Sequence, residues 1–214
     1  SRERVPEDAS VLVVAGPEND LLPVELEKIT AYLRSGGRVL FMLDPGAAPG
    51  LSRYLGGFDF EIGDDIIIDR QSQIYGANYL TPVVEDYSDK HILTYEFSVA
   101  TCFPAARSVG IKEDRNKGSY NLARTSANSW TVTGGLTEEN LKFDPDRHRR
   151  GPIEIMAVTA VEVSDDHGET EETGESLKKW GKLLVIGDSD FAGNTPTGQS
   201  FKAATPDTAM TMIM

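Results

Sequence analysis

The feature that most constrains the fold is a strand–helix–strand pattern at the start of the chain. Residues 9–17 form a short, β-branched apolar run that stops at Gly16-Pro17, as buried strands do. Apolar residues then recur at helical spacing in residues 22–37, which end in a glycine pair and so predict a helix and its end. A second apolar run, residues 38–45, completes a βαβ unit with short connections.

Both predicted strands are apolar throughout rather than at alternate positions. Strands of this kind are typical of parallel sheets that are covered on both faces. A βαβ unit joins parallel strands by a right-handed crossover. The sequence therefore predicts an α/β fold in which a mostly parallel sheet is flanked by helices.

Further elements follow with less regular spacing. The patterns predict a short helix at 49–58, a third strand at 64–70, and irregular β-rich insertions in the middle third of the chain. Possible strands within that region are 106–113 and 128–135, and strand 152–163 is expected to pair with 182–188.

We expect a single α/β domain over residues 9–194. Seven acidic residues and no Lys or Arg occur between Glu162 and Glu175, so residues 164–178 are interpreted as an acidic surface loop. The order of ligands in a calcium-binding loop is not met there. Residues 195–214 are a tail of small and polar residues, in which no helical or strand spacing is found.

Composition excludes several classes of protein. The formal charge of −13, from 34 acidic and 21 basic residues, argues against a nucleic-acid partner, because phosphate contacts need clustered Lys and Arg. The single cysteine, Cys102, excludes an internal disulfide and a Cys-cluster metal site. The sequence has no signal peptide and no apolar run of about 18 residues. Because the chain starts at Ser1 rather than Met, we expect an excised piece.

Polar side chains at the ends of predicted strands are the candidates for a ligand site. The carboxyl edge of an open α/β sheet is where ligands bind. The candidate ligand-binding residues at this edge are Asp44, Asp69, Asp188, Ser189 and Asp190. If the carboxylates converged on magnesium, the protein would be a metal-dependent hydrolase.

The segment Gly187-Asp188-Ser189 also resembles the nucleophile block of some esterases. A serine nucleophile needs a histidine base, but all three histidines precede this block. The favoured interpretation is structural: a strand that ends at Asp188, followed by a helix capped by Ser189 or Asp190. On this interpretation there is no catalytic residue, no resident metal and no cofactor.

A carbohydrate-binding module is a further alternative. It rests on aromatic residues in the middle third, which would form a shallow groove: Tyr75, Tyr79, Tyr87 and Tyr95. As a lone cysteine outside any elbow motif, Cys102 is interpreted as a buried small hydrophobe.

Four blocks in order resemble the auxiliary component of ABC-type transport systems, a family that includes gliding-motility ABC transporter auxiliary proteins. The first is "LVVAGPENDLLPVELEKITAYLRSGGRVLFMLDP" and the second "YSDKHILTYEFSVATCFPAARSV", in which Ile92 and Leu93 replace the family's usual Pro and Ile. The third is "LARTSANSWTVT", and the fourth is the closing strand pair that ends in "GKLLVIGDSDFAGN".

The resemblance implies an extracytoplasmic, periplasmic α/β domain with a flavodoxin-like or glutamine-amidotransferase-like three-layer sandwich. Membrane helices outside this piece would anchor the parent protein beside an ABC permease and its ATPase. The expected function is that of a non-enzymatic accessory domain that binds a protein partner or an envelope ligand. No catalytic residues carry over from the family.

Overall fold

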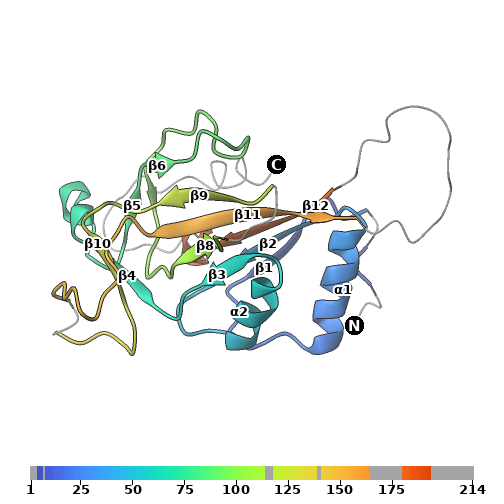
Figure 1. The fold of residues 1–214 in the computed structure, drawn as a ribbon, viewed down its shortest axis with the longest axis horizontal. Coiled ribbons are helices and arrows are strands. Elements are labelled where there is room, and N and C mark those ends of the chain that lie inside the picture. The colour runs from blue at the N-terminus through green and yellow to red at the C-terminus, as the bar shows by residue number, and fades with distance from the viewer. Residues whose placement is uncertain (1–3, 7, 114–117, 139–140, 164–179, 194–214) are drawn as a thin grey trace.

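The protein is described by a computed structural model, which covers residues 4–6, 8–113, 118–138, 141–163 and 180–193. Its main sheet has six strands in the order β1-β2-β12-β11-β9-β6 (Figure 1). From one edge of the sheet to the other, these strands are Leu12–Ala15, Arg38–Met42, Trp180–Ile186, Glu154–Glu162, Tyr120–Arg124 and Asp86–Tyr87.

The predicted βαβ unit is present. Strands β1 and β2 are parallel, with Leu12 opposite Val39, and helix α1 (Pro23–Arg34) connects them. The helix begins at a proline, whose fixed φ suits the first turn. The Glu25 carboxylate accepts a hydrogen bond of 2.8 Å from the Leu22 N–H and so satisfies a backbone donor at the helix start.

The expected mostly parallel, helix-flanked sheet is wrong. Strand β12 does run parallel to β2, but β11, β9 and β6 each join their neighbour antiparallel. The predicted pairing of 152–163 with 182–188 is confirmed, as an antiparallel β11–β12 pair. No crossover helix is needed between antiparallel neighbours, so the later strands bring no helices to the sheet.

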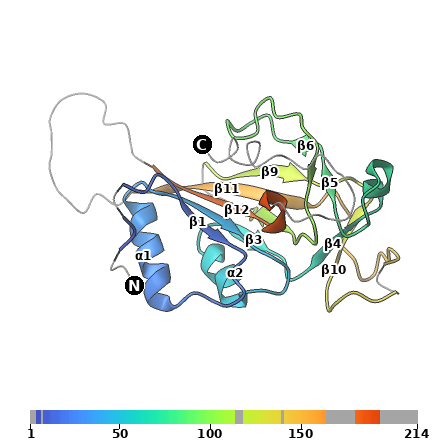
Figure 2. The ribbon, with the colours of Figure 1, turned by 180° about the vertical axis from the view of Figure 1, so that it is seen from behind.

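The layers also differ from a flavodoxin-like or glutamine-amidotransferase-like three-layer sandwich. Helices α1 and α2 (Pro49–Gly56) lie on the same side of the sheet (Figures 1 and 2). Their buried side chains pack with alternate residues of the central strands, namely Val39, Phe41, Leu183 and Val185. Irregular segments cover the opposite face instead, where Phe103 and Phe191 stack with ring centroids 5.3 Å apart.

The continuous apolar runs of β2 and β12 are therefore explained by burial on both faces rather than by two helical layers. Leu40, Met42, Leu184 and Ile186 point into the second core, which the loops close. A buried strand face requires an apolar partner, and side chains from irregular segments satisfy that requirement as well as a helix does.

Short strand pairs and two segments of 3₁₀-helix make up the other regular elements in the described part of the chain. β4 (Ile66–Asp69) pairs with β10 (Ser129–Val132), β3 (Phe60–Ile62) with β8 (Val109–Ile111), and β5 (Val83–Val84) with β7 (Thr101–Cys102). The 3₁₀ turns are η1 (Arg70–Tyr75) and η2 (Asp190–Ala192).

The predicted acidic loop, residues 164–178, and the predicted tail, residues 195–214, lie outside the described residues. Within the part that is described, no helix has the length and apolar character needed to cross a membrane.

Substituting Leu33→Ala tests how strongly α1 is held on the sheet. Leu33 has no exposed surface, so truncation leaves a cavity and should lower the free energy of unfolding by about 2–5 kcal/mol. Val24→Ala on the same helix is the control, because Val24 is 50% exposed and its change should stay within about 0.5 kcal/mol. Urea denaturation measures both, and similar losses in the two variants would contradict the packing described.

Candidate functional site at the strand ends

The three parallel strands β1, β2 and β12 end at the same edge of the main sheet. The Gly16 N–H donates to the Met42 carbonyl and the Leu43 N–H to the Ile186 carbonyl, each at 2.9 Å. A Cβ on Gly16 would lie 2.8 Å from the Ser189 hydroxyl oxygen, so the turns after β1 and β12 are in close contact. We call Gly16, Asp44, Asp188, Ser189 and Asp190 the strand-end site.

Asp44 and Ser189 form the central interaction of the strand-end site, although they are 145 positions apart. The Ser189 N–H donates to one Asp44 carboxylate oxygen and the Ser189 hydroxyl to the other, each at 2.8 Å. A carboxylate that accepts two such bonds is held in a fixed orientation, and bonds to a charged acceptor are the stronger kind. Asp44 therefore joins the end of β2 to the turn after β12.

Asp188 is a fully buried carboxyl group. One of its oxygens accepts a 2.8 Å bond from the Asp190 N–H, while Oδ2 has no hydrogen-bond partner. The pKa of Asp188 rises to about 8, chiefly because of burial; the hydrogen bond from the Asp190 N–H lowers it, and the nearby charges of Asp190 and Asp44 raise it. Asp188 is thus largely protonated at neutral pH, because its charged form would be desolvated.

The predicted helix cap is partly wrong. The helix that follows is only the three-residue turn η2, and Ser189 precedes it without a side-chain capping bond. Asp188 makes the local bond to the Asp190 N–H instead, in the pattern of an Asx turn. The Ser189 hydroxyl is engaged by Asp44 rather than by the turn.

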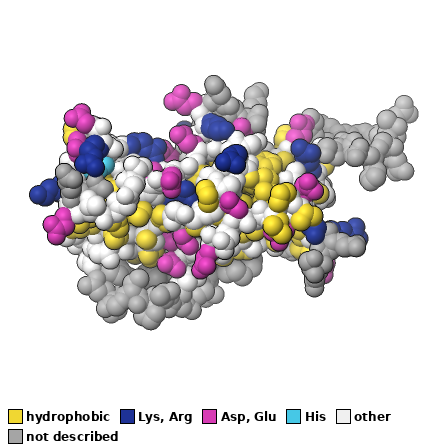
Figure 3. All heavy atoms as spheres, turned by 90° about the horizontal axis from the view of Figure 1, so that it is seen from below, with side chains coloured by type: hydrophobic (Ala, Val, Ile, Leu, Met, Phe, Trp, Pro, Cys, Tyr) yellow, Lys and Arg dark blue, Asp and Glu magenta, His cyan; other side chains and the backbone are white. Residues whose placement is uncertain are grey.

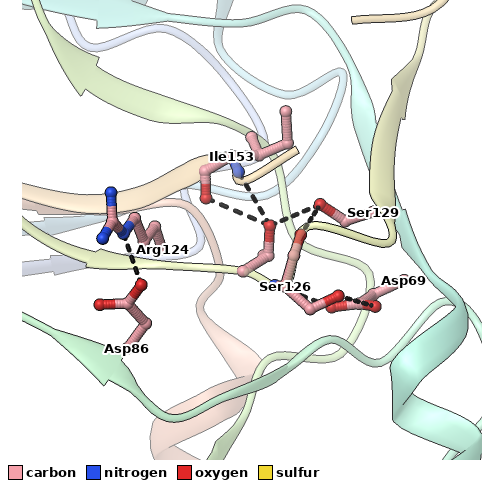
Figure 4. A network of polar contacts seen from close by, with 7 residues as sticks. Asp69, Asp86, Arg124, Ser126, Ser129 and Ile153 are labelled. Atoms are coloured by element: carbon pink, nitrogen blue, oxygen red, sulfur yellow. Dashed lines mark hydrogen bonds and ion pairs between the residues drawn. The ribbon is translucent and has the colours of Figure 1, made fainter. Parts of the chain in front are cut away.

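Asp69 belongs to a different network from the other predicted site residues (Figure 4). Its carboxylate accepts bonds from the Ser126 hydroxyl at 2.7 Å, the Ser126 N–H at 3.2 Å and the Gln71 N–H at 2.9 Å. Strand β4, which ends at Asp69, pairs with β10 in a two-stranded sheet outside the main sheet. Four of the five predicted residues therefore lie at the same sheet edge, and Asp69 supports a turn elsewhere.

Arg107 is a residue of this edge that the sequence reasoning missed. Its side chain is 2% exposed, and its guanidinium donates to the backbone carbonyls of Gly63 and Asp44, at 2.7 Å and 3.1 Å. Burial lowers the pKa of Arg107, whereas the carboxylate of Asp65 opposes that shift. The available signal was an arginine inside the apolar segment "FPAARSVGI", since a buried charge of this kind must be hydrogen-bonded.

Gly187 allows the close approach of the Arg107 backbone. The Arg107 N–H donates to the Gly187 carbonyl at 2.7 Å, and a Cβ on Gly187 would come within 2.0 Å of the Arg107 carbonyl oxygen. Only glycine fits this contact without a shift of the backbone. The first residue of the Gly-Asp-Ser segment, Gly187, is therefore required for packing against the Arg107 backbone.

The chemistry available at the strand-end site is limited by these internal bonds. Among the described residues, no three His, Cys, Asp or Glu side chains are grouped so that they could hold a metal ion. The Ser189 hydroxyl donates to a carboxylate, whereas a serine nucleophile needs a histidine base within hydrogen-bond reach. The hydrogen bonds between Asp44 and Ser189 join the end of β2 to the turn after β12.

The aromatic alternative also meets a specific difficulty. Tyr87 packs against the main core and forms an edge-to-face pair with Phe97, with centroids 4.7 Å apart. Tyr79 and Tyr95 are exposed, whereas Tyr87 is partly buried in that core. Cys102 is half-buried, and burial raises the pKa of its thiol, which is opposite to the shift in an activated thiol.

Fold and site together define a β-rich domain rather than the expected α/β sandwich: its main sheet is mostly antiparallel, its helices lie on one face, and hydrogen bonds link the turns after β2 and β12. Residues 1–211 match the family described as "ABC-type uncharacterized transport system". The chain belongs to this family of ABC transport auxiliary proteins, which confirms the resemblance seen in the sequence.

Solved structures similar to the chain include the following two, of which the first shows likeness of fold. The mmIFT52 N-terminal domain is 16% identical, with a TM-score of 0.58 over 95% of this chain and 75% of that one. A ThuA-like protein from Bacteroides uniformis is 14% identical, with a TM-score of 0.40 over 86% of this chain and 61% of that one. No curated protein sequence matches significantly.

Asp188→Asn should change how stability depends on pH. The pKa of Asp188 is about 8 in the folded protein and about 3.9 when unfolded, so the folded state keeps a proton that the unfolded state releases. This group therefore lowers stability as pH rises from about 4 to about 8. Asparagine cannot ionise, so the stability of the variant relative to wild type should rise across this range, by up to about 1.4 kcal/mol per pH unit.

The measurement is urea denaturation of both proteins at several pH values between the two pKa values. Glu27→Gln, on the exposed surface of α1, is the matched control and should show no such trend. Stability curves for Asp188→Asn and wild type that stay parallel would contradict a protonated Asp188.

Ser189→Ala removes the hydroxyl that bonds to Asp44. We expect a loss of roughly 1.5 kcal/mol in the free energy of unfolding, the size of a hydrogen bond to a charged group. In a double-mutant cycle, Ser189→Ala should lower the free energy of unfolding less in the Asp44→Ala background than in the wild-type protein, because the Asp44 carboxylate that the hydroxyl bonds to is already absent. Strictly additive losses would show that the two side chains do not interact.

Proposed function

We propose that this chain is a non-enzymatic, extracytoplasmic accessory domain of an ABC transport system, which works by binding a protein partner or an envelope ligand. Membership of the auxiliary family supports the connection to ABC transport. The partners we propose are the permease and ATPase of the same system, and the location is the periplasmic face of the inner membrane. A role in gliding motility or export is the more specific form of the proposal.

The observation that carries the non-enzymatic role is the use of the strand-end polar groups inside the fold. Both Asp44 oxygens accept bonds from Ser189, and Asp188 is fully buried. A catalytic carboxylate must reach the proton or metal ion that it acts on. Asp69, another carboxylate of the metal-dependent alternative, is bonded to Ser126 in a separate network.

The basic side chains do not favour a nucleic-acid partner either. Figure 3 shows the helix-bearing side of the molecule, where Lys and Arg side chains are dispersed among acidic ones instead of forming one field. With a net charge of −13, a protein partner or a small envelope ligand is the better-supported choice.

Purification from membranes tests the association. The tagged full-length protein, solubilised in mild detergent, should bring down an ABC permease and its ATPase, and an unrelated tagged membrane protein should not. An externally added protease should cleave the domain in spheroplasts if it lies on the periplasmic side. Recovery from the cytosol without membrane partners would overturn the proposal.

A complementation assay tests the absence of catalysis. The Asp190 side chain is exposed, so Asp190→Asn should fold with unchanged stability and support full transport activity in a deletion strain. Loss of transport by a stably folded Asp190→Asn protein would instead point to a catalytic carboxylate.

A further inference from the structure

A small pocket lies on the face of the sheet opposite the helices, near the starts of β1, β2 and β12. Its volume is about 160 Å³. The apolar part of its lining includes Leu40, Val158 and Leu184 from the sheet and Leu93 from the covering loop. Its polar lining consists of Arg38, His91 and Lys182, and no acidic side chain contributes. In a chain with a net charge of −13, this is a local excess of basic groups.

The strand register places two of these basic groups side by side. Lys182 of β12 lies directly opposite Arg38 of β2. Side chains alternate between faces along a strand, so Lys182 shares the face of Leu184, and Arg38 shares that of Leu40. Like charges at directly opposite positions of a sheet repel one another.

Nothing in the described part of the chain compensates this repulsion. Among those residues, no carboxylate forms an ion pair with the Arg38 guanidinium or the Lys182 ammonium. Both side chains are exposed, so water solvates them in the free protein. An anion placed between them would remove the repulsion and gain two charge-assisted contacts.

The loop that covers the pocket adds a hydrogen-bond donor. The His91 Nδ1 accepts a bond of 3.3 Å from the Leu93 N–H, which assigns the proton of a neutral His91 ring to Nε2. Burial, and then the Lys182 ammonium, lower the pKa of His91. Ile92, beside it on the pocket lining, is 77% exposed and offers apolar surface that a ligand could cover.

We propose that this pocket binds a small carboxylate that carries an aliphatic tail. The carboxylate would lie between Arg38 and Lys182, and the tail would pack on Leu40, Val158 and Leu184. Charge complementarity selects an anion, and the apolar lining selects a hydrocarbon chain over a hydrated ion such as free phosphate. The site lies apart from the strand-end site, and the inference stands whether or not the accessory role is correct.

The test is an NMR titration of the isotope-labelled domain with hexanoate. Millimolar hexanoate should shift the signals of His91, Leu93 and Leu184 in a saturable way. Acetate, which lacks the tail, and hexan-1-ol, which lacks the charge, should each bind at least about fivefold more weakly. Equal binding of hexan-1-ol, or no saturable shift with hexanoate, would overturn the proposal.

Matched variants separate specific recognition from overall charge. Lys182→Gln and Arg38→Gln should each weaken hexanoate binding by about fivefold, the effect of losing one exposed ion pair. Arg53→Gln makes the same change of charge on α2, on the helical side of the sheet, and should leave binding unchanged. An equal effect of Arg53→Gln would show that only net charge matters and would overturn the site.

A second ligand distinguishes two sources of the same chemistry. Acetyl-glycyl-leucine carries a free carboxylate beside an aliphatic side chain, as the end of a peptide does. Tighter binding of this compound than of hexanoate would assign the pocket to peptide termini, and weaker binding would assign it to free aliphatic acids. Either result supports recognition of a carboxylate with an apolar stem.

Discussion

The parallel pairing of β2 with β12 is the constraint on which the rest of the structure depends. It joins strands far apart in the chain, from Arg38 opposite Lys182 to Met42 opposite Ile186. Because these strands are central, their side chains must be covered on both faces, by α1 and α2 on one and by loops on the other. The same pairing brings the turns after the two strands together, so Asp44 can bond to Ser189.

The two ends of this strand pair have opposite electrostatic character. At the carboxyl ends, acidic and hydroxyl groups meet: Asp44 is bonded to Ser189, and Asp188 is largely protonated, with one oxygen bonded and Oδ2 without a partner. At the amino ends, Arg38 and Lys182 lie in register without a carboxylate partner among the described residues. Groups that are already hydrogen-bonded stabilise the protein, whereas unpaired like charges leave interaction energy available to a ligand.

Buried charged groups at the strand ends are accommodated in two different ways. Arg107 keeps its guanidinium hydrogen-bonded to backbone carbonyls, including those of Gly63 and Asp44. Asp188 has only one bonded oxygen, and its pKa rises to about 8 as a result of burial. Desolvation acts on both groups, but only the carboxyl can become neutral near physiological pH. The Gly-Asp-Ser segment thus holds a carboxyl group that burial keeps largely protonated.

The sequence by itself determined the local elements and the family. Helical spacing and glycine stops defined the βαβ unit, apolar runs identified the strands that pair as β11 and β12, and four ordered blocks led to the auxiliary family. Tertiary structure alone decided the antiparallel direction of β11, β9 and β6, the helices on one face, and the separation of Asp69 from Asp44. An apolar run indicates that a strand is buried on both faces. It does not indicate which segments cover those faces or whether the neighbouring strand is parallel or antiparallel. Those depend on contacts between residues far apart in the chain, as does the role of Arg107.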